Sequence, residues 1–110
     1  MAYLGEFEQL ILFSLVELGE QTHGAAIRET IELRTGRVAS AGAIYTALRR
    51  LSERDLVTSS VGKPEEGRVG RPRKYYTLRP EGAKALQGSY TTMQAMSGGL
   101  VDKLASLAGQ

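Results

Sequence analysis

The sequence predicts a mainly α-helical protein with a small β-hairpin: a winged helix-turn-helix domain followed by one long C-terminal helix. Three observations predict this fold. Three segments carry apolar residues at helical spacing, two short strand-like runs flank a basic loop rich in Gly and Pro, and the last segment has apolar residues four and three apart. A length of 110 residues suits one compact unit with an appendage. We expect the winged domain over residues 1–79 and the C-terminal helix over residues 80–110.

Composition narrows the class of protein. Hydrophobic residues make up 42% of the chain and there are three Pro, which excludes a disordered or collagen-like protein. With no Cys and one His, a disulfide framework, a thiolate zinc site and a multi-histidine metal site are excluded, so no metal or cofactor is expected. The lack of Cys is compatible with a reducing cytoplasm, where we expect the protein to act. The longest apolar run, residues 10–18, falls short of the roughly 20 residues that a membrane span needs.

Basic residues gather in the middle of the chain. Residues 1–33 hold one Arg against six Glu, residues 34–79 hold eleven Lys or Arg against four acidic residues, and residues 80–110 are balanced. Such a block is either a solvated surface or a surface for an anionic partner such as nucleic acid. The residues that accompany the charge decide between the two.

Three helices are predicted in the first half of the chain. Apolar residues three and four apart over residues 6–18 indicate a largely buried helix that Gly19 ends. Thr22 stands where a capping residue would begin the second helix, which Gly36 ends, and Ser40 is a good N-cap for the third helix. The face that the third helix turns to the core is predicted to consist of Ile44, Ala47, Leu48 and Leu51.

A hairpin of two strands is predicted next. Residues 56–61 are rich in β-branched side chains, and residues 74–78 alternate so that Tyr76 and Leu78 share one face. The connecting loop holds Gly, Pro and four cations, and it forms the wing. We expect one tyrosine of the second strand in the core, and the other, Tyr75, free to contact a nucleic-acid backbone.

Pro80 opens the last predicted helix, in which apolar residues recur four and three apart over three heptads. These residues are Leu86, Tyr90, Met93, Leu100, Leu104 and Leu107. Because so small a domain cannot cover this seam alone, we expect the helix to pair with its copy in a second chain, with folding back on its own domain as the alternative. Each interior Gly costs a helix about 1 kcal/mol relative to Ala, so Gly98 and Gly99 mark a kink, a close helix crossing or a frayed end.

The third helix, with Tyr45 followed by the run Leu48-Arg49-Arg50-Leu51, and the Gly-Arg-Pro-Arg-Lys-Tyr-Tyr motif of residues 70–76 resemble the PadR-like family of bacterial transcriptional regulators. The resemblance covers residues 4–86. It implies a DNA-binding winged helix-turn-helix regulator of the compact branch, with a single dimerising C-terminal helix.

Two positions depart from the family pattern. Asp55 stands where a Gly usually turns the chain into the first strand of the hairpin, and Asp visits the left-handed backbone region more readily than most residues, so the turn should survive. Arg79 stands where a Thr commonly caps the last helix. The missing hydroxyl predicts a looser helix start, partly offset by the fixed geometry of Pro80.

Candidate DNA-contacting residues lie on the third helix and on the wing. Small residues at the helix start let backbone N–H groups approach phosphates, and polar side chains further along reach base edges or phosphates. Guanidinium groups on a narrow wing suit the minor groove and its flanking phosphates. The predicted set is Ser40, Ala41, Gly42, Tyr45, Thr46 and Arg49 on the helix, and Arg68, Arg71, Arg73, Lys74 and Tyr75 on the wing. For Tyr45, packing against the wing remains an alternative to DNA contact.

The predicted function is that of a sequence-specific regulator of transcription that binds double-stranded DNA, namely a homodimeric repressor on an inverted-repeat operator that a small molecule releases. The competing interpretations are an RNA-binding winged helix, which would show more exposed aromatic side chains, and a protein-interaction module, which would add apolar anchors beside the wing arginines. His23 has no nucleophile or acid at a recognisable spacing, and no Lys-Ser or Lys-Thr pair follows the wing glycines, so no enzyme is predicted.

Overall fold

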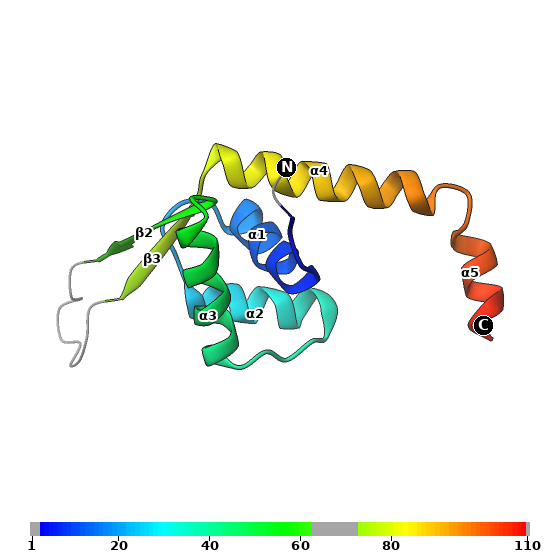
Figure 1. The fold of residues 1–110 in the computed structure, drawn as a ribbon. Helices are drawn as coiled ribbons and strands as arrows, with labels where there is room; N and C mark the ends of the chain where they lie inside the picture. Colours follow the sequence, from blue (N-terminus) through cyan, green and yellow to red (C-terminus); the bar gives the residue numbers. More distant parts are fainter. Residues whose placement is uncertain (1–2, 63–72, 110) are drawn as a thin grey trace.

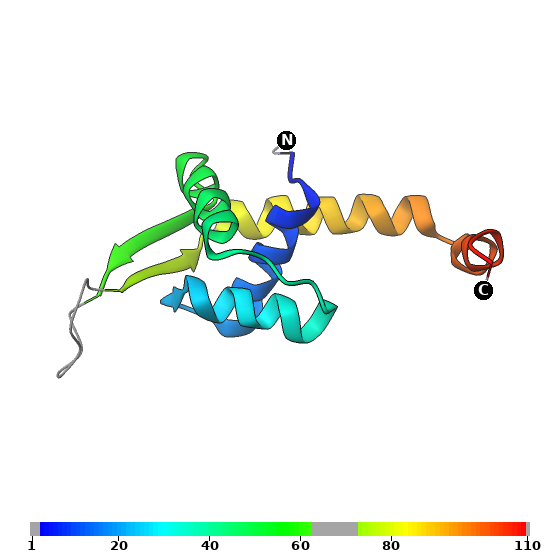
Figure 2. The same ribbon diagram turned by 90° about the horizontal axis from the view of Figure 1, so that it is seen from below.

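The computed structural model describes residues 3–62 and 73–109. A cluster of three helices carries a small sheet on one side, and a fourth helix crosses the cluster and runs beyond it (Figure 1). The part of the fourth helix that runs beyond the cluster, together with the last helix, forms the C-terminal arm. The view from below shows the same arrangement, with the last helix at the far end of this arm (Figure 2). The elements are α1 (Glu6–Leu18), β1 (Thr22–His23), α2 (Gly24–Thr35), α3 (Ala41–Glu53), β2 (Val57–Val61), β3 (Lys74–Leu78), α4 (Pro80–Ser97) and α5 (Val101–Leu107).

Local hydrogen bonds define where the second and third helices begin. Ser40 caps α3 as predicted, because its Oγ accepts the backbone N–H of Ala43 at 3.1 Å. The predicted cap of α2 is wrong: the next residue, His23, accepts the N–H of Ala26 at its Nδ1 (3.2 Å). Thr22 is instead buried in β1, and its hydroxyl donates to the carbonyl of Gly19 at 3.0 Å.

The sheet has three antiparallel strands in the order β1-β3-β2, whereas the sequence predicts two. Strand β2 pairs with β3 from Val57 opposite Leu78 to Val61 opposite Lys74. On the other edge of β3, Thr22 lies opposite Tyr76. A strand of two residues is too short to show alternation, so β1 exists only through its pairing with a segment more than 50 positions away.

The core lies among α1, α2 and α3 and is closed by Leu56 and Val57 at the start of β2, by Tyr76 of β3 and by the first turns of α4. All four residues predicted for the core face of α3 are buried, and Tyr76 is the tyrosine that enters the core, with 4% of its surface exposed. Gly82 lets α4 approach the turn before β2, because a Cβ there would lie 2.2 Å from the carbonyl oxygen of Leu56. The start of α4 therefore belongs to the same core as the helices before it.

Of the two positions that depart from the family pattern, the turn at Asp55 is confirmed, and the looser start of α4 stays a prediction. Asp55 adopts the left-handed conformation (φ +58°), and the chain turns there into β2. Arg79 provides no side-chain cap for α4, and Pro80 occupies the first helical turn. The guanidinium of Arg79 lies 3.7 Å from the carboxylate of Asp55 and 3.4 Å from that of Glu81, so the two unusual residues share an ion pair.

The prediction of a single long C-terminal helix is wrong, and the kink predicted as one outcome at Gly98 and Gly99 is confirmed. Helix α4 ends at Ser97, Gly99 takes a left-handed conformation (φ +76°), and the short α5 follows in a new direction (Figure 1). Two successive glycines lower the helix propensity at this point, and left-handed backbone ends an α-helix. The radius of gyration is 16.3 Å, against about 13 Å for a compact chain of this length, so the arm makes the protein elongated.

Candidate nucleic-acid interface

The exposed side of α3 carries every helix residue that the sequence predicts for DNA contact. These residues, all exposed, are Ser40, Ala41, Gly42, Tyr45, Thr46 and Arg49. The opposite side of α3 supplies its four core residues, so the helix is divided sharply into a packed face and a free face.

The start of α3 is accessible to an anion. The N–H groups of Ala41 and Gly42 stand in the first helical turn, where no carbonyl of the same helix can accept them. A Cβ added at Gly42 would meet nothing within 4 Å, so the space around this turn is open. The partial positive charge of the helix dipole lies at the same end, and together these features favour a phosphate group there.

Tyr45 both packs and remains accessible. Its ring lies against Gly24 at the start of α2, yet 46% of its surface is exposed. Burial raises the pKa of Tyr76 above its ordinary value, and the nearby Tyr45 adds a smaller contribution in the same direction. Tyr45 therefore rests on the start of α2 and near the core tyrosine, with its outer half facing solvent.

Arg49 lies one turn beyond Tyr45 on the same side of α3. Within residues 3–62 and 73–109 it forms no ion pair and no hydrogen bond, whereas Arg34, Arg37, Arg54 and Arg79 each pair with a carboxylate. No carboxylate compensates the charge of this exposed guanidinium, and all its N–H donors are available to an incoming ligand.

Thr46 faces a different direction from Tyr45 and Arg49. It lines a shallow hollow between α3 and the start of α1, together with Arg50 and the acidic residues Glu6 and Glu8. The predicted helix set is thus divided by the structure. Tyr45 and Arg49 share one side of α3. Thr46 lies with Gly42 toward Glu6 and Glu8, whose carboxylates are paired with Arg37 and Arg54.

Only the base of the wing is described. Arg73 is half-buried and its carbonyl accepts the N–H of Gly62 at 2.8 Å, and Lys74 is exposed at the start of β3. The ring of Tyr75 covers Gly62 on one side and meets the ring of His23 edge to face at 6.4 Å, so it is partly covered. Two predicted wing residues, Arg68 and Arg71, lie outside the described residues.

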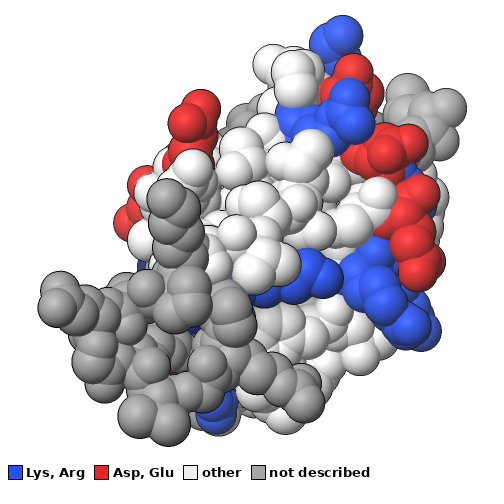
Figure 3. All heavy atoms as spheres, turned by 90° about the vertical axis from the view of Figure 1, so that its left-hand side faces the viewer, with Lys and Arg blue, Asp and Glu red and all other residues white. Residues whose placement is uncertain are grey.

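Figure 3 shows the protein from the end that carries the hairpin. In this view the acidic side chains lie toward the two sides of the face, and its middle is largely uncharged, with basic side chains between. An anionic partner approaching this middle region would meet little repulsion from the described residues.

The C-terminal arm presents apolar side chains to solvent. Leu86, the first residue of the predicted seam, is 4% exposed and belongs to the core of its own chain. The others are half or more exposed: Tyr90, Met93, Leu100, Leu104 and Leu107. The turn at the two glycines places Leu104 and Leu107 on α5 and Leu100 at its N-cap, so the seam is divided between α4 and α5.

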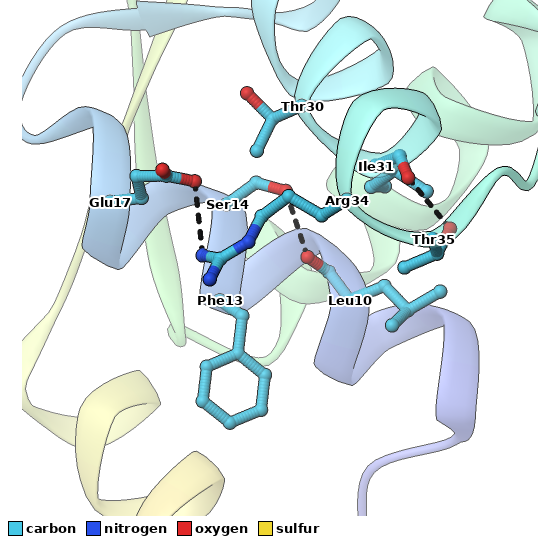
Figure 4. Close-up of a pocket in the computed structure, with 8 residues that line it drawn as sticks. All are labelled: Leu10, Phe13, Ser14, Glu17, Thr30, Ile31, Arg34 and Thr35. Atoms are coloured by element: carbon cyan, nitrogen blue, oxygen red, sulfur yellow. Dashed lines mark hydrogen bonds and ion pairs between the residues drawn. The ribbon is translucent and has the colours of Figure 1, made fainter.

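A groove of about 300 Å³ lies between α1 and α2, and no residue of α3 lines it (Figure 4). Leu10 and Ile31 contribute apolar surface, and the ion pair of Arg34 with Glu17 (3.2 Å) closes one rim. The ring of Phe13 points out of the groove toward α4, where it meets Tyr90 edge to face at 6.3 Å.

The described residues form neither a cluster of metal-binding side chains nor a helix able to span a membrane. Among residues 3–62 and 73–109, no group of three acidic or histidine side chains is arranged to hold a metal ion. Within the same ranges, no helix combines the length and apolar character that crossing a bilayer requires.

Three helices with a hairpin after the third, and a free polar face on that third helix, define a winged-helix protein of the DNA-binding class. The chain belongs to the transcriptional regulator PadR-like family, whose family model matches residues 11–88. A comparison with curated proteins gives no significant match.

Solved structures show the same fold. A PadR family transcription regulator from Clostridium difficile is 26% identical with a TM-score of 0.74, over 91% of this chain and 99% of that one. A PadR family transcriptional regulator from Eggerthella lenta is 25% identical with a TM-score of 0.69, over 90% of this chain and 86% of that one. A winged-helix DNA-binding protein from STIV, 18% identical over 89% of this chain and 98% of its own, has a TM-score of 0.71.

Proposed function

We propose that this protein binds double-stranded DNA in a sequence-specific manner, as a homodimer, and represses transcription at an inverted-repeat operator. The observation that carries the proposal is the free side of α3, where Tyr45 and Arg49 lie one turn apart beyond an open helix start, and where Arg49 has no acidic partner among the described residues. Such a helix fits the major groove, and the cations of the hairpin would contact neighbouring phosphates.

The exposed apolar residues of α4 and α5 support the homodimer. One recognition helix covers too few base pairs to select a site in a genome, whereas two copies related by a twofold axis double the contacts and fix their spacing. Exposed Met93, Leu100 and Leu104 offer a surface that a second copy would cover. Half-sites are then expected about 10 or 21 base pairs apart, one or two helical turns.

Selection of bound fragments from a random duplex library tests the proposal directly. We expect an enriched sequence with inverted-repeat symmetry, and binding that weakens steeply as salt rises. Recovery of no preferred sequence would contradict specific recognition. Stronger binding to single-stranded RNA of the same sequence, or to no nucleic acid at all, would favour the RNA-binding or protein-interaction alternative.

Release from DNA by a small molecule is part of the same proposal and is supported only by the groove between α1 and α2. Its volume is at the lower end of the range for small-molecule sites, and its lining combines apolar side chains with a charged rim. Screening small molecules for loss of operator binding, first on the wild type and then on a Thr30→Trp variant that fills the groove, tests this part. An effector that acts equally on both proteins binds elsewhere.

A further inference from the structure

Arg28 connects α2 to the start of the recognition helix α3. It lies on α2, one turn after Gly24, and its Nε donates to the carbonyl oxygen of Ala39 at 2.7 Å. Ala39 is buried and immediately precedes Ser40, the N-cap of α3. The guanidinium is thereby held beside the first turn of α3, although 11 residues separate it from Ala39 in sequence.

This contact leaves most of the guanidinium available. Arginine has five N–H donors, and Ala39 uses one of them. Within residues 3–62 and 73–109, the Nη atoms of Arg28 form no hydrogen bond and no ion pair, and the side chain is exposed. Glu32 lies one turn further along α2, a spacing that often pairs charges, but it forms no ion pair with Arg28.

The partner of Arg28 distinguishes it from the other paired arginines. Arg34, Arg37, Arg54 and Arg79 each lie against a carboxylate that offsets their charge. The carbonyl of Ala39 is neutral, so it orients the guanidinium and leaves its positive charge uncompensated. An oriented guanidinium fork is the geometry that binds phosphate through two parallel hydrogen bonds.

We propose that Arg28 binds a phosphodiester group of the DNA backbone next to the start of α3, and that Ala39 holds it in position to do so. This inference rests on the proposed DNA-binding function and adds a contact on α2, outside both the recognition helix and the wing. Because phosphates are the same in every sequence, Arg28 contributes to affinity and register and does not read bases. The spacing of side chains in the sequence gives no sign of this role, since it depends on a contact between α2 and the connection to α3.

The salt dependence of duplex binding separates this role from a structural one. We expect Arg28→Gln to weaken binding about tenfold on the selected operator and on a random duplex alike, as loss of a charge-assisted hydrogen bond would. The slope of log K against log salt should fall by about 0.9, which corresponds to one phosphate contact. Arg28→Lys retains the charge and should keep the wild-type slope. Lys84→Gln is the control, because it removes one positive charge from an exposed position of α4, and its slope should equal that of the wild type.

Replacing single phosphates by neutral methylphosphonates locates the contact. In the wild type, one substitution in each half-site should weaken binding, and Arg28→Gln should be insensitive to that same substitution. An unchanged salt slope in Arg28→Gln, or equal sensitivity of wild type and variant at every phosphate, would overturn the proposal. If Arg28→Gln is unfolded by circular dichroism, Arg28→Met replaces it as the neutral variant: an unchanged slope and phosphate scan there overturns the inference, and loss of one contact supports it. Failure of the wild type to bind any duplex would instead refute the proposed function.

Discussion

The ring of Tyr45 lies so close to Gly24 that a β-carbon at position 24 would be 2.8 Å from Cε1 and Cζ and 2.9 Å from Oη. A side chain at the first residue of α2 would therefore displace this ring. The absence of a side chain at Gly24 lets the aromatic ring of the recognition helix rest on α2 and holds that ring at a defined place on the proposed DNA-contacting side.

Gly24→Ala should displace Tyr45 without unfolding the protein. The atoms that would clash are at the far end of a side chain that is 46% exposed, so the ring can swing outward. We expect weaker operator binding and a thermal unfolding midpoint within a few degrees of wild type. Tyr45→Ala completes a double-mutant cycle. In a protein that already carries Tyr45→Ala, Gly24→Ala should have no further effect on binding. Additive losses in the double variant would show that the two residues act independently.

Arg49→Ala should reduce discrimination between base pairs. If its guanidinium reads a guanine in the major groove, its loss costs about 1 to 3 kcal/mol on the operator and relaxes one position of the selected sequence. Arg50→Ala is the neighbouring control, since Arg50 lies on the side of α3 that faces Glu6 and Glu8. Repeating the duplex selection with each variant measures the effect. Equal losses on all duplexes would assign Arg49 to a phosphate instead.

Gly82→Ala should destabilise the fold by about 1 to 3 kcal/mol, the usual cost of overpacking a core. The new methyl group would lie 2.2 Å from the backbone oxygen of Leu56 and 2.7 Å from Cδ1 of Leu78, and the backbone cannot move aside cheaply. Gly88→Ala, on the same helix with nothing within 4 Å, should raise stability by about 0.5 to 1 kcal/mol through helix propensity. Urea denaturation of both variants measures the difference, and equal destabilisation would show that space at Gly82 is not the cause.

Aspartate at both Leu100 and Leu104 should abolish the dimer while leaving the single chain folded. These side chains are 51% and 66% exposed, so carboxylates there cost nothing in an isolated chain but would be buried without partners in a dry interface. Sedimentation should report a monomer that binds DNA only weakly and without sequence preference. Ser106→Asp adds charge to α5 without removing an apolar side chain and should remain dimeric. A dimeric double variant, or a monomeric wild type at micromolar concentration, would refute the assembly proposal.

Elements determined by local chemistry were predictable from the sequence. The apolar spacing of α3 and the hydroxyl of Ser40 predict both the buried face and the first turn of that helix, and the structure confirms them. Asp55 is a second example. Because Asp tolerates left-handed backbone, the sequence predicts a turn into β2 at this residue, and Asp55 has a φ of +58° in the structure.

Features that depend on distant contacts were not predictable. Strand β1 forms because Thr22 and His23 meet the far edge of β3, and neither residue carries a strand pattern of its own. The position of Thr46 on the helix predicts one shared side with Tyr45 and Arg49, yet the approach of α1 places Thr46 beside Glu6 and Glu8. Likewise, Gly98 and Gly99 predict an interruption of the last helix. The direction of α5 was not predictable, because it depends on the left-handed backbone that Gly99 adopts.

The joint at Gly98 and Gly99 has a consequence for how operator preference can change during evolution. In a dimer held together by α5, the two glycines between α4 and α5 set the angle at which each α4 leaves the interface. That angle in turn determines how far apart the two copies of α3 are held. The spacing between half-sites would then change independently of the bases within each half-site, through two small residues outside the core. A regulator built this way could acquire a differently spaced operator by a single substitution in its arm, while every residue that reads the DNA stays the same.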